Sequence, residues 1–143
     1  MARYRTGVTK AAPATGTFVS QFRTPADRVA RIFEIKVFTS TAVALSVGVI
    51  RSATVGATFT SATPQAEDVR SVASTCAVDT AITTAPTIGT VYMEKIVLPA
   101  VIGSGMIWTF PQGLVVPVSA GLLLWNFGAA TGPAVEVSWI HDE

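Results

Sequence analysis

The side chains that could carry out catalysis or bind a metal are few in this sequence of 143 residues. His141 is the single histidine and Cys76 the single cysteine. Hydrolysis or group transfer needs a nucleophile, a base or a metal held among polar supports, and this inventory offers no such set. One cysteine excludes an intrachain disulfide and a Cys-based zinc site. We therefore predict no enzyme, no cofactor and no metal site, with Cys76 a small buried hydrophobic residue.

The sequence ends on three potential ligands in a row, His141, Asp142 and Glu143. Three consecutive residues at a chain end do not easily converge on one ion with defined geometry. We interpret them as a solvated tail.

Carboxylates and glycines give no catalytic pattern either. Glu34, Glu94 and Glu136 are scattered over predicted strands, where a charge normally marks the solvent face rather than a glycosidase pair. Residues 103–105 (GSG) lack the following helix and lysine of a phosphate loop and are interpreted as a turn.

The three tryptophans are the candidates for a carbohydrate-stacking platform. Trp108 and Trp139 share a strand face with other large apolar residues, which predicts that they belong to the core. Trp125 is the one that could face outward. Core packing is the better interpretation for the set.

Composition indicates one domain with little surface charge. Half of the residues are hydrophobic and 13% are charged, against roughly 25% in ordinary soluble domains. Such a surface often meets another protein. The apolar stretches 96–110 and 113–127 are interrupted by Pro and Gly and are too short to span a membrane. We expect no membrane association, no signal peptide and synthesis in the cytoplasm.

Basic residues are concentrated near the start of the chain. Residues 1–36 carry a net charge of +5 and the rest −4, which favours head-to-tail attraction between copies or docking on an acidic protein surface. Residues 1–28 lack sustained periodicity and are predicted to form an extended arm. The candidate partner contacts in it are Arg3, Tyr4, Arg5, Lys10, Phe18, Phe22 and Arg23. Dense Lys/Arg runs are missing, which argues against nucleic acid.

Period-2 alternation predicts strands over most of the remaining chain. Residues 29–38 and 42–51 are expected to pair as an antiparallel hairpin. Residues 52–88 are expected to be a long surface excursion with at most one short helix near residues 63–73. Further strands are predicted at 89–98, 105–110, 113–127 (broken at 117–121) and 133–140. The fold class is therefore all-β: an antiparallel two-sheet sandwich, jelly-roll-like, formed by residues 29–143.

Several stretches resemble small virion structural proteins of tailed bacteriophages. They are residues 31–35 (RIFEI), 47–51 (VGVIR), 103–110 (GSGMIWTF), 113–117 (GLVVP), 123–126 (LLWN), 137–139 (VSW) and the final Asp142-Glu143. The resemblance implies a β-sandwich decoration or cement protein on the outer capsid surface. It implies the major capsid protein as partner and a homo-oligomer, with a trimer suited to three-fold positions.

Two other functions stay open at this point. One is a tail or head-fibre module that binds host glycans through Trp125 or the 52–88 segment. The other is a small jelly-roll coat protein whose basic arm touches the genome.

Overall fold

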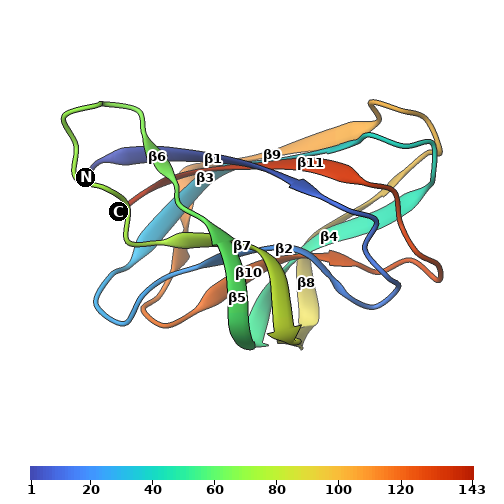
Figure 1. Ribbon diagram of the computed structural model, residues 1–143, viewed down its shortest axis with the longest axis horizontal. Helices are drawn as coiled ribbons and strands as arrows, with labels where there is room; N and C mark the ends of the chain where they lie inside the picture. Colours follow the sequence, from blue (N-terminus) through green and yellow to red (C-terminus); the bar gives the residue numbers. More distant parts are fainter.

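The computed structural model describes all 143 residues, which form eleven strands and no helix. Two antiparallel sheets pack face to face (Figure 1). Sheet A has the order β6 (Gln65–Ala66), β1 (Arg3–Lys10), β11 (Val135–Asp142), β3 (Ala30–Thr39) and β9 (Gly105–Val116). Sheet B has the order β5 (Ala57–Ala62), β7 (Ala77–Thr84), β2 (Phe18–Arg23), β10 (Gly121–Asn126), β4 (Leu45–Thr54) and β8 (Thr87–Leu98). The predicted all-β two-sheet sandwich is confirmed.

The core lies between the two sheets and is built by alternation along each strand. In β11, Val135, Val137 and Trp139 point inward and are buried, while Glu136 faces solvent. Trp139 lies across the interior, and its indole Nε1 donates a hydrogen bond to Ser20 Oγ of sheet B at 3.1 Å. This bond satisfies the polar edge of a fully buried ring and links the two layers.

The expected N-terminal arm is wrong, because residues 1–28 supply one strand to each sheet. β1 pairs with β11 over its whole length, from Arg3 opposite Asp142 to Lys10 opposite Val135. β2 lies between β7 and β10. In β1 the inward positions are Tyr4, Thr6 and Val8. Because one of these three positions is a threonine, hydrophobic and polar residues do not alternate clearly in β1, and the sequence pattern does not indicate a strand there.

The expected hairpin of residues 29–38 with 42–51 is also wrong. Its two halves are strands, β3 and β4, but β3 lies in sheet A and β4 in sheet B. Both bury residues against the same core from opposite sides, and β4 also buries Ile50 on its other face. A period-2 pattern fixes which face is buried and not which strand is the partner. The connection at 40–44 also lacks the Asn-Gly or Asp-Gly signal of a tight hairpin.

The expected short helix near residues 63–73 does not form. Asp68 instead makes a local turn, in which its carboxylate accepts a hydrogen bond from the Arg70 backbone N–H at 2.9 Å. Val69 and Val72, the apolar residues that would have shared a helix face, are both exposed. A one-turn helix with no surface to pack against has nothing to offset its nucleation cost.

The rest of the 52–88 segment forms strands β5, β6, β7 and the start of β8. Near them, on the outer face of sheet B, lies a second cluster of buried apolar side chains: Phe18, Ile50, Leu123 and Trp125. Ile82 and Ile88, from this same segment, pack against it. The expected surface excursion is therefore wrong for most of this segment, which supplies strands to both sheets.

The later strands agree with prediction in position, as β8, β9, β10 and β11. β9 continues through Pro111 to Val116 because it is an edge strand, where a residue without an N–H is tolerated. The structure contains no helix that is long and apolar enough to cross a membrane.

We predict that Phe22→Ala lowers the free energy of unfolding by about 3–5 kcal/mol, because Phe22 is 0% exposed in the main core. Urea denaturation measures the loss. The matched control is Phe38→Ala on the outer face of sheet A, where the ring is 36% exposed, with an expected loss of no more than about 1 kcal/mol. Equal losses at the two positions would contradict the placement of β2 in the core.

Candidate functional site

The predicted contact residues divide into buried and surface positions. Tyr4 and Phe22 are buried between the two sheets, and Phe18 is buried in the second cluster on the outer face of sheet B. The Tyr4 hydroxyl donates a hydrogen bond to the Val72 carbonyl at 2.9 Å. These three side chains hold the domain together and are not available to a partner.

The basic residues of the same set are mostly occupied inside the chain. Three form ion pairs with acids from later in the sequence: Arg3 with Asp142, Arg5 with Glu67, and Arg23 with Asp79. The fourth, Lys10, lies over the ring of Phe18 with Nζ 4.5 Å from the centroid, and burial lowers its pKa. The charge asymmetry of the sequence therefore serves contacts between strands of one molecule.

Arg23 and Asp79 belong to a polar network on sheet B. The Asp79 carboxylate is fully buried and accepts hydrogen bonds from Gln21 Nε2 at 2.8 Å, from Arg23 Nε at 3.1 Å and from Ser61 Oγ. Arg23 also stacks over Phe59, 3.9 Å from the ring centroid. The network joins β2, β5 and β7, which gives it a structural role.

The positions considered for catalysis or sugar binding do not assemble into a site. Glu94 lies on sheet B, whereas Glu34 and Glu136 lie on sheet A, paired with Lys36 and Thr9 respectively. Gly103 has φ of +82° in the connection before β9, as expected of a turn. Trp108 and Trp139 are core residues as predicted. Trp125 is 9% exposed and buried in the second cluster, so it offers no exposed stacking face.

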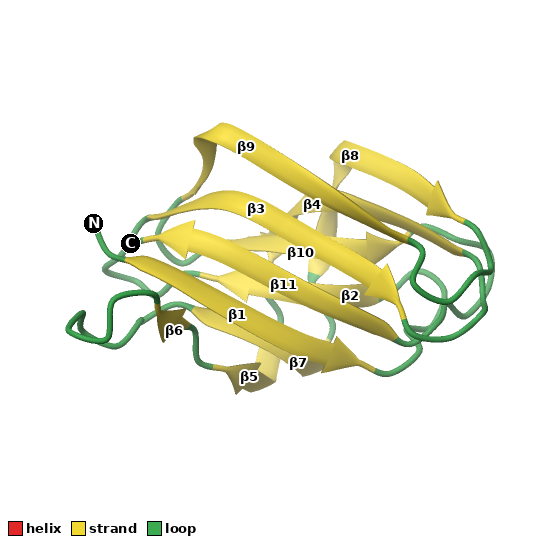
Figure 2. Cartoon of the chain, turned by 90° about the horizontal axis from the view of Figure 1, so that it is seen from above, coloured by secondary structure: helices red, strands yellow, loops and turns green.

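Many of the exposed apolar side chains lie on two strands at one side of the sandwich and on the connection between those strands. Strands β8 and β9 are the terminal strands of their sheets and lie on the same side of the molecule (Figure 2). Val91 and Val97 on β8 are 78% and 68% exposed. These exposed positions, which we call the apolar edge, are Val91, Tyr92, Met93 and Val97 on β8, Val101 and Ile102 in the 99–104 connection, and Ile107 and Val115 on β9.

The apolar edge also presents unpaired backbone. β8 and β9 are each 12 residues long, and each has a partner strand on one side only. Long edge strands with apolar side chains invite pairing with another chain unless something covers them. Glu94 and Lys95 are the only charged residues on these two strands. Sequence reasoning missed this surface because alternation does not tell an edge strand from a central one.

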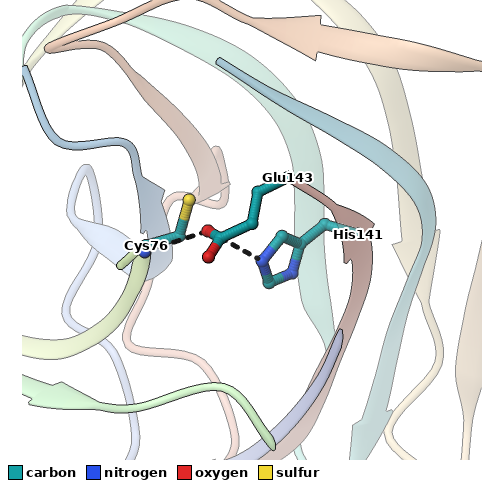
Figure 3. A group of neighbouring side chains, drawn as sticks. All are labelled: Cys76, His141 and Glu143. Carbon is teal, nitrogen blue, oxygen red and sulfur yellow. Dashed lines mark hydrogen bonds and ion pairs between the residues drawn. The ribbon is translucent and has the colours of Figure 1, made fainter. Parts of the chain in front are cut away.

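A second group of side chains converges at the end of the sandwich where the two chain termini lie. It consists of Cys76, His141 and Glu143, whose ligand-type atoms all lie within 4.8 Å of one another (Figure 3). The expectation of a solvated tail is wrong for His141, which is fully buried. β11 continues to Asp142 between β1 and β3, so His141 points into the interior beside Trp139.

Glu143 is held by the segment that leads into β7. Its carboxylate accepts hydrogen bonds from Ser74 Oγ at 3.1 Å and from the backbone N–H groups of Thr75 at 2.9 Å and Cys76 at 3.2 Å. The carboxylate lies between Cys76 and His141 (Figure 3). Its Oε2 is 3.9 Å from His141 Nε2.

His141 is packed between aromatic rings. It stacks on Tyr4 with ring centroids 5.3 Å apart and meets the edge of Phe22 at 4.6 Å. Neither ring nitrogen has a hydrogen-bond partner. A buried imidazole without partners is uncommon because desolvating its polar atoms costs free energy.

Burial controls protonation in this group. It lowers the pKa of His141 to about 4, despite the opposing effect of Glu143 and Asp142. Burial also raises the pKa of the Cys76 thiol, with Glu143 adding to the effect. For Glu143, burial acts to raise the pKa, but hydrogen bonds from Cys76, Thr75 and Ser74 together hold it below its usual range. At neutral pH the group is a thiol, a neutral imidazole and a carboxylate.

The sequence did contain a signal for the inward position of His141. The alternation of Val135, Val137 and Trp139 extends to residue 141 without a break in spacing. A β-bulge between Ile140 and His141 in the pairing with β3 leaves that orientation intact. Cys76 lies 65 positions away, and no local pattern places it beside β11.

Comparisons with known proteins give no family. No family model matches the chain, and no curated protein matches it. Among solved structures, the N-terminal cellulose-binding domain of Cellulomonas fimi β-1,4-glucanase C is 12% identical, with all of this chain and 79% of that one aligned and a TM-score of 0.21. The VP2 subviral particle of infectious bursal disease virus is 14% identical, with 97% and 40% aligned and a TM-score of 0.18. These scores are too low to support an inference about function.

We predict that the metal-free protein loses about 2 kcal/mol of stability between about pH 7.5 and about pH 5 through His141 alone. The pKa of this residue is lowered to about 4 in the folded state and is about 6.5 in the unfolded chain. The unfolded state therefore binds more protons in this window, and stability falls as pH falls.

Urea denaturation at both pH values, with a chelator present, measures the change. A His141→Gln variant removes the titrating group and should show a much smaller loss over the same interval. Equal losses in the two proteins would contradict a buried neutral imidazole.

Proposed function

We propose that the protein is a virion structural protein of a tailed bacteriophage, a capsid decoration or cement protein that binds the outer surface of the shell and stabilises it. The proposal begins from the sequence resemblance. The observation that carries it further is the apolar edge, which combines exposed apolar side chains with two open strand edges on one side of a rigid sandwich.

The apolar edge favours a role in protein assembly. Covering apolar area contributes about 25 cal/mol per Å² removed from water, and patches of this kind mark sites of protein contact. Because Glu94 and Lys95 are the only charges on β8 and β9, a partner can approach with little desolvation of ions. Backbone groups of the open edges supply the hydrogen bonds.

A shell protein is the partner that this surface suits best. A decoration protein binds in many copies, so a moderate contact in each copy is sufficient. The major capsid protein would supply the surface beneath the apolar edge, and a second or third copy of the chain could share it around a three-fold position. The protein would be made in the host cytoplasm and act on the outside of the capsid.

The structure does not favour the two alternative functions, because the residues proposed to carry them are not exposed as those functions need. The glycan-binding module was expected to act through Trp125 or residues 52–88; the Trp125 ring is buried, and most of residues 52–88 form strands of the two sheets. A coat protein with a genome-binding arm required residues 1–28 to extend from the domain, and they form β1 and β2. Arg3 and Arg5 are paired with carboxylates.

We predict that Val97→Arg weakens binding to capsids of the encoding phage at least tenfold, because a charge placed at the centre of an apolar contact must be desolvated. Co-sedimentation with capsids stripped of this chain measures binding. The matched control is Val69→Arg, in the turn after β6 on the opposite side, where the side chain is 94% exposed. It should bind as the unmodified chain does. Undiminished binding by Val97→Arg would contradict the proposed contact surface.

A further inference from the structure

The end of β11 and the segment before β7 bring three different donor groups together. Cys76 offers a thiol, His141 an imidazole and Glu143 a carboxylate, with ligand atoms within 4.8 Å of one another. Although the sequence predicted no metal site, we propose that these three residues form a binding site for a divalent transition-metal ion, with zinc as the ion that best fits the donors. The inference is independent of the proposed role on a capsid.

The unpaired ring nitrogens of His141 support a metal site independently of the distances between the three residues. Its side chain is fully buried, and both ring nitrogens lack a hydrogen-bond partner. Glu143 Oε2 lies 3.9 Å from Nε2, too far for a hydrogen bond. A metal ion between the imidazole and the carboxylate would satisfy that nitrogen and remove the cost of leaving it unpaired.

The geometry needs only a small adjustment to accept an ion. Zinc binds sulfur at about 2.3 Å and nitrogen or oxygen at about 2.0–2.2 Å, so tetrahedral ligand atoms lie roughly 3.3–3.7 Å apart. The ligand atoms, which lie within 4.8 Å of one another, would have to move about 1 Å closer together, and rotation of the side chains can supply that movement. The three residues leave a fourth position open for water, as in sites with three protein ligands.

The surroundings already orient one ligand and leave a path to the site. Ser74 and the N–H groups of Thr75 and Cys76 fix the Glu143 carboxylate, in the manner of outer hydrogen bonds that position metal ligands. A hollow of about 240 Å³, lined in part by Tyr4, Arg28 and Glu143, opens beside the group. An ion can therefore reach Glu143 from solvent.

Charge also balances in the occupied site. Binding requires the Cys76 thiol to release its proton to solvent, which leaves a thiolate, a carboxylate and a neutral imidazole around the dication. The net charge of ion and ligands is then zero, a condition that favours a buried position. One proton should be released for each ion bound.

A metal ion at this position would tie the two layers together. His141 lies on β11 of sheet A and Glu143 directly follows that strand, while Cys76 directly precedes β7 of sheet B. The ion would close the end of the sandwich where both chain termini lie (Figure 1). Its effect would be on stability.

The test uses the full chain without a polyhistidine tag, freed of metal by a chelator and titrated with Co²⁺ and with Zn²⁺. We expect one Co²⁺ per chain with a sulfur-to-cobalt charge-transfer band, displaced by Zn²⁺. We also expect Zn²⁺ to raise Tm by roughly 5–10 °C at about 100 times Kd. Calorimetry in two buffers of different ionisation enthalpy should show about one proton released per Zn²⁺.

Three variants separate a metal site from nonspecific attraction. Cys76→Ser should abolish the charge-transfer band, and Glu143→Gln should weaken Zn²⁺ binding at least tenfold. The matched control is Asp142→Asn, which removes one adjacent carboxylate that points to Arg3 instead and should bind Zn²⁺ as the unmodified chain does. Circular dichroism without metal checks that each variant folds.

The proposal is overturned if the unmodified chain shows no charge-transfer band and no stabilisation by Zn²⁺. It is equally overturned if the band persists in Cys76→Ser, or if Asp142→Asn loses as much affinity as Glu143→Gln.

Discussion

The insertion of the last strand between the first and third strands is the constraint on which the rest of the structure depends. β11 pairs with β1 on one side and with β3 on the other, and without it sheet A separates into two parts. The strand also carries Trp139, whose hydrogen bond to Ser20 reaches across the core to sheet B. Sheet A is therefore complete only when residues 135–142 are in place. Pairing between the two ends of the chain has a high loop-closure cost, so we expect slow and highly cooperative folding.

The same insertion explains the two features with functional content. It brings His141 and Glu143 from the chain end against Cys76, and it makes the basic start of the chain part of the sandwich, where Arg3 pairs with Asp142. It also leaves β9 at the edge of sheet A, with β3 as its only partner. The unpaired side of β9 faces the same side of the molecule as the unpaired side of β8 (Figure 2).

The sequence predicted the fold class and most strand positions, because alternation in β3, β4, β8 and β11 is strong. It did not predict the partners of those strands, since alternation determines only which face is buried. β1 was missed because Thr6 and the glycine at position 7 weaken its pattern. For the same reason, contacts expected of an arm at Tyr4 and Phe22 became core contacts. The group around His141 joins residues far apart in sequence, and only the pairing of β11 brings them together.

We propose that the sandwich contributes one side, the apolar edge, to an assembly. Electron cryomicroscopy of the virion whose genome encodes this chain tests that claim most directly. We predict many copies of the sandwich on the outer capsid surface, with β8 and β9 against a neighbouring protein and the turn at residues 67–71 directed away from it. A virion without this chain, or copies that meet the shell through the side of β5 and β6 with β8 and β9 exposed to solvent, would contradict it.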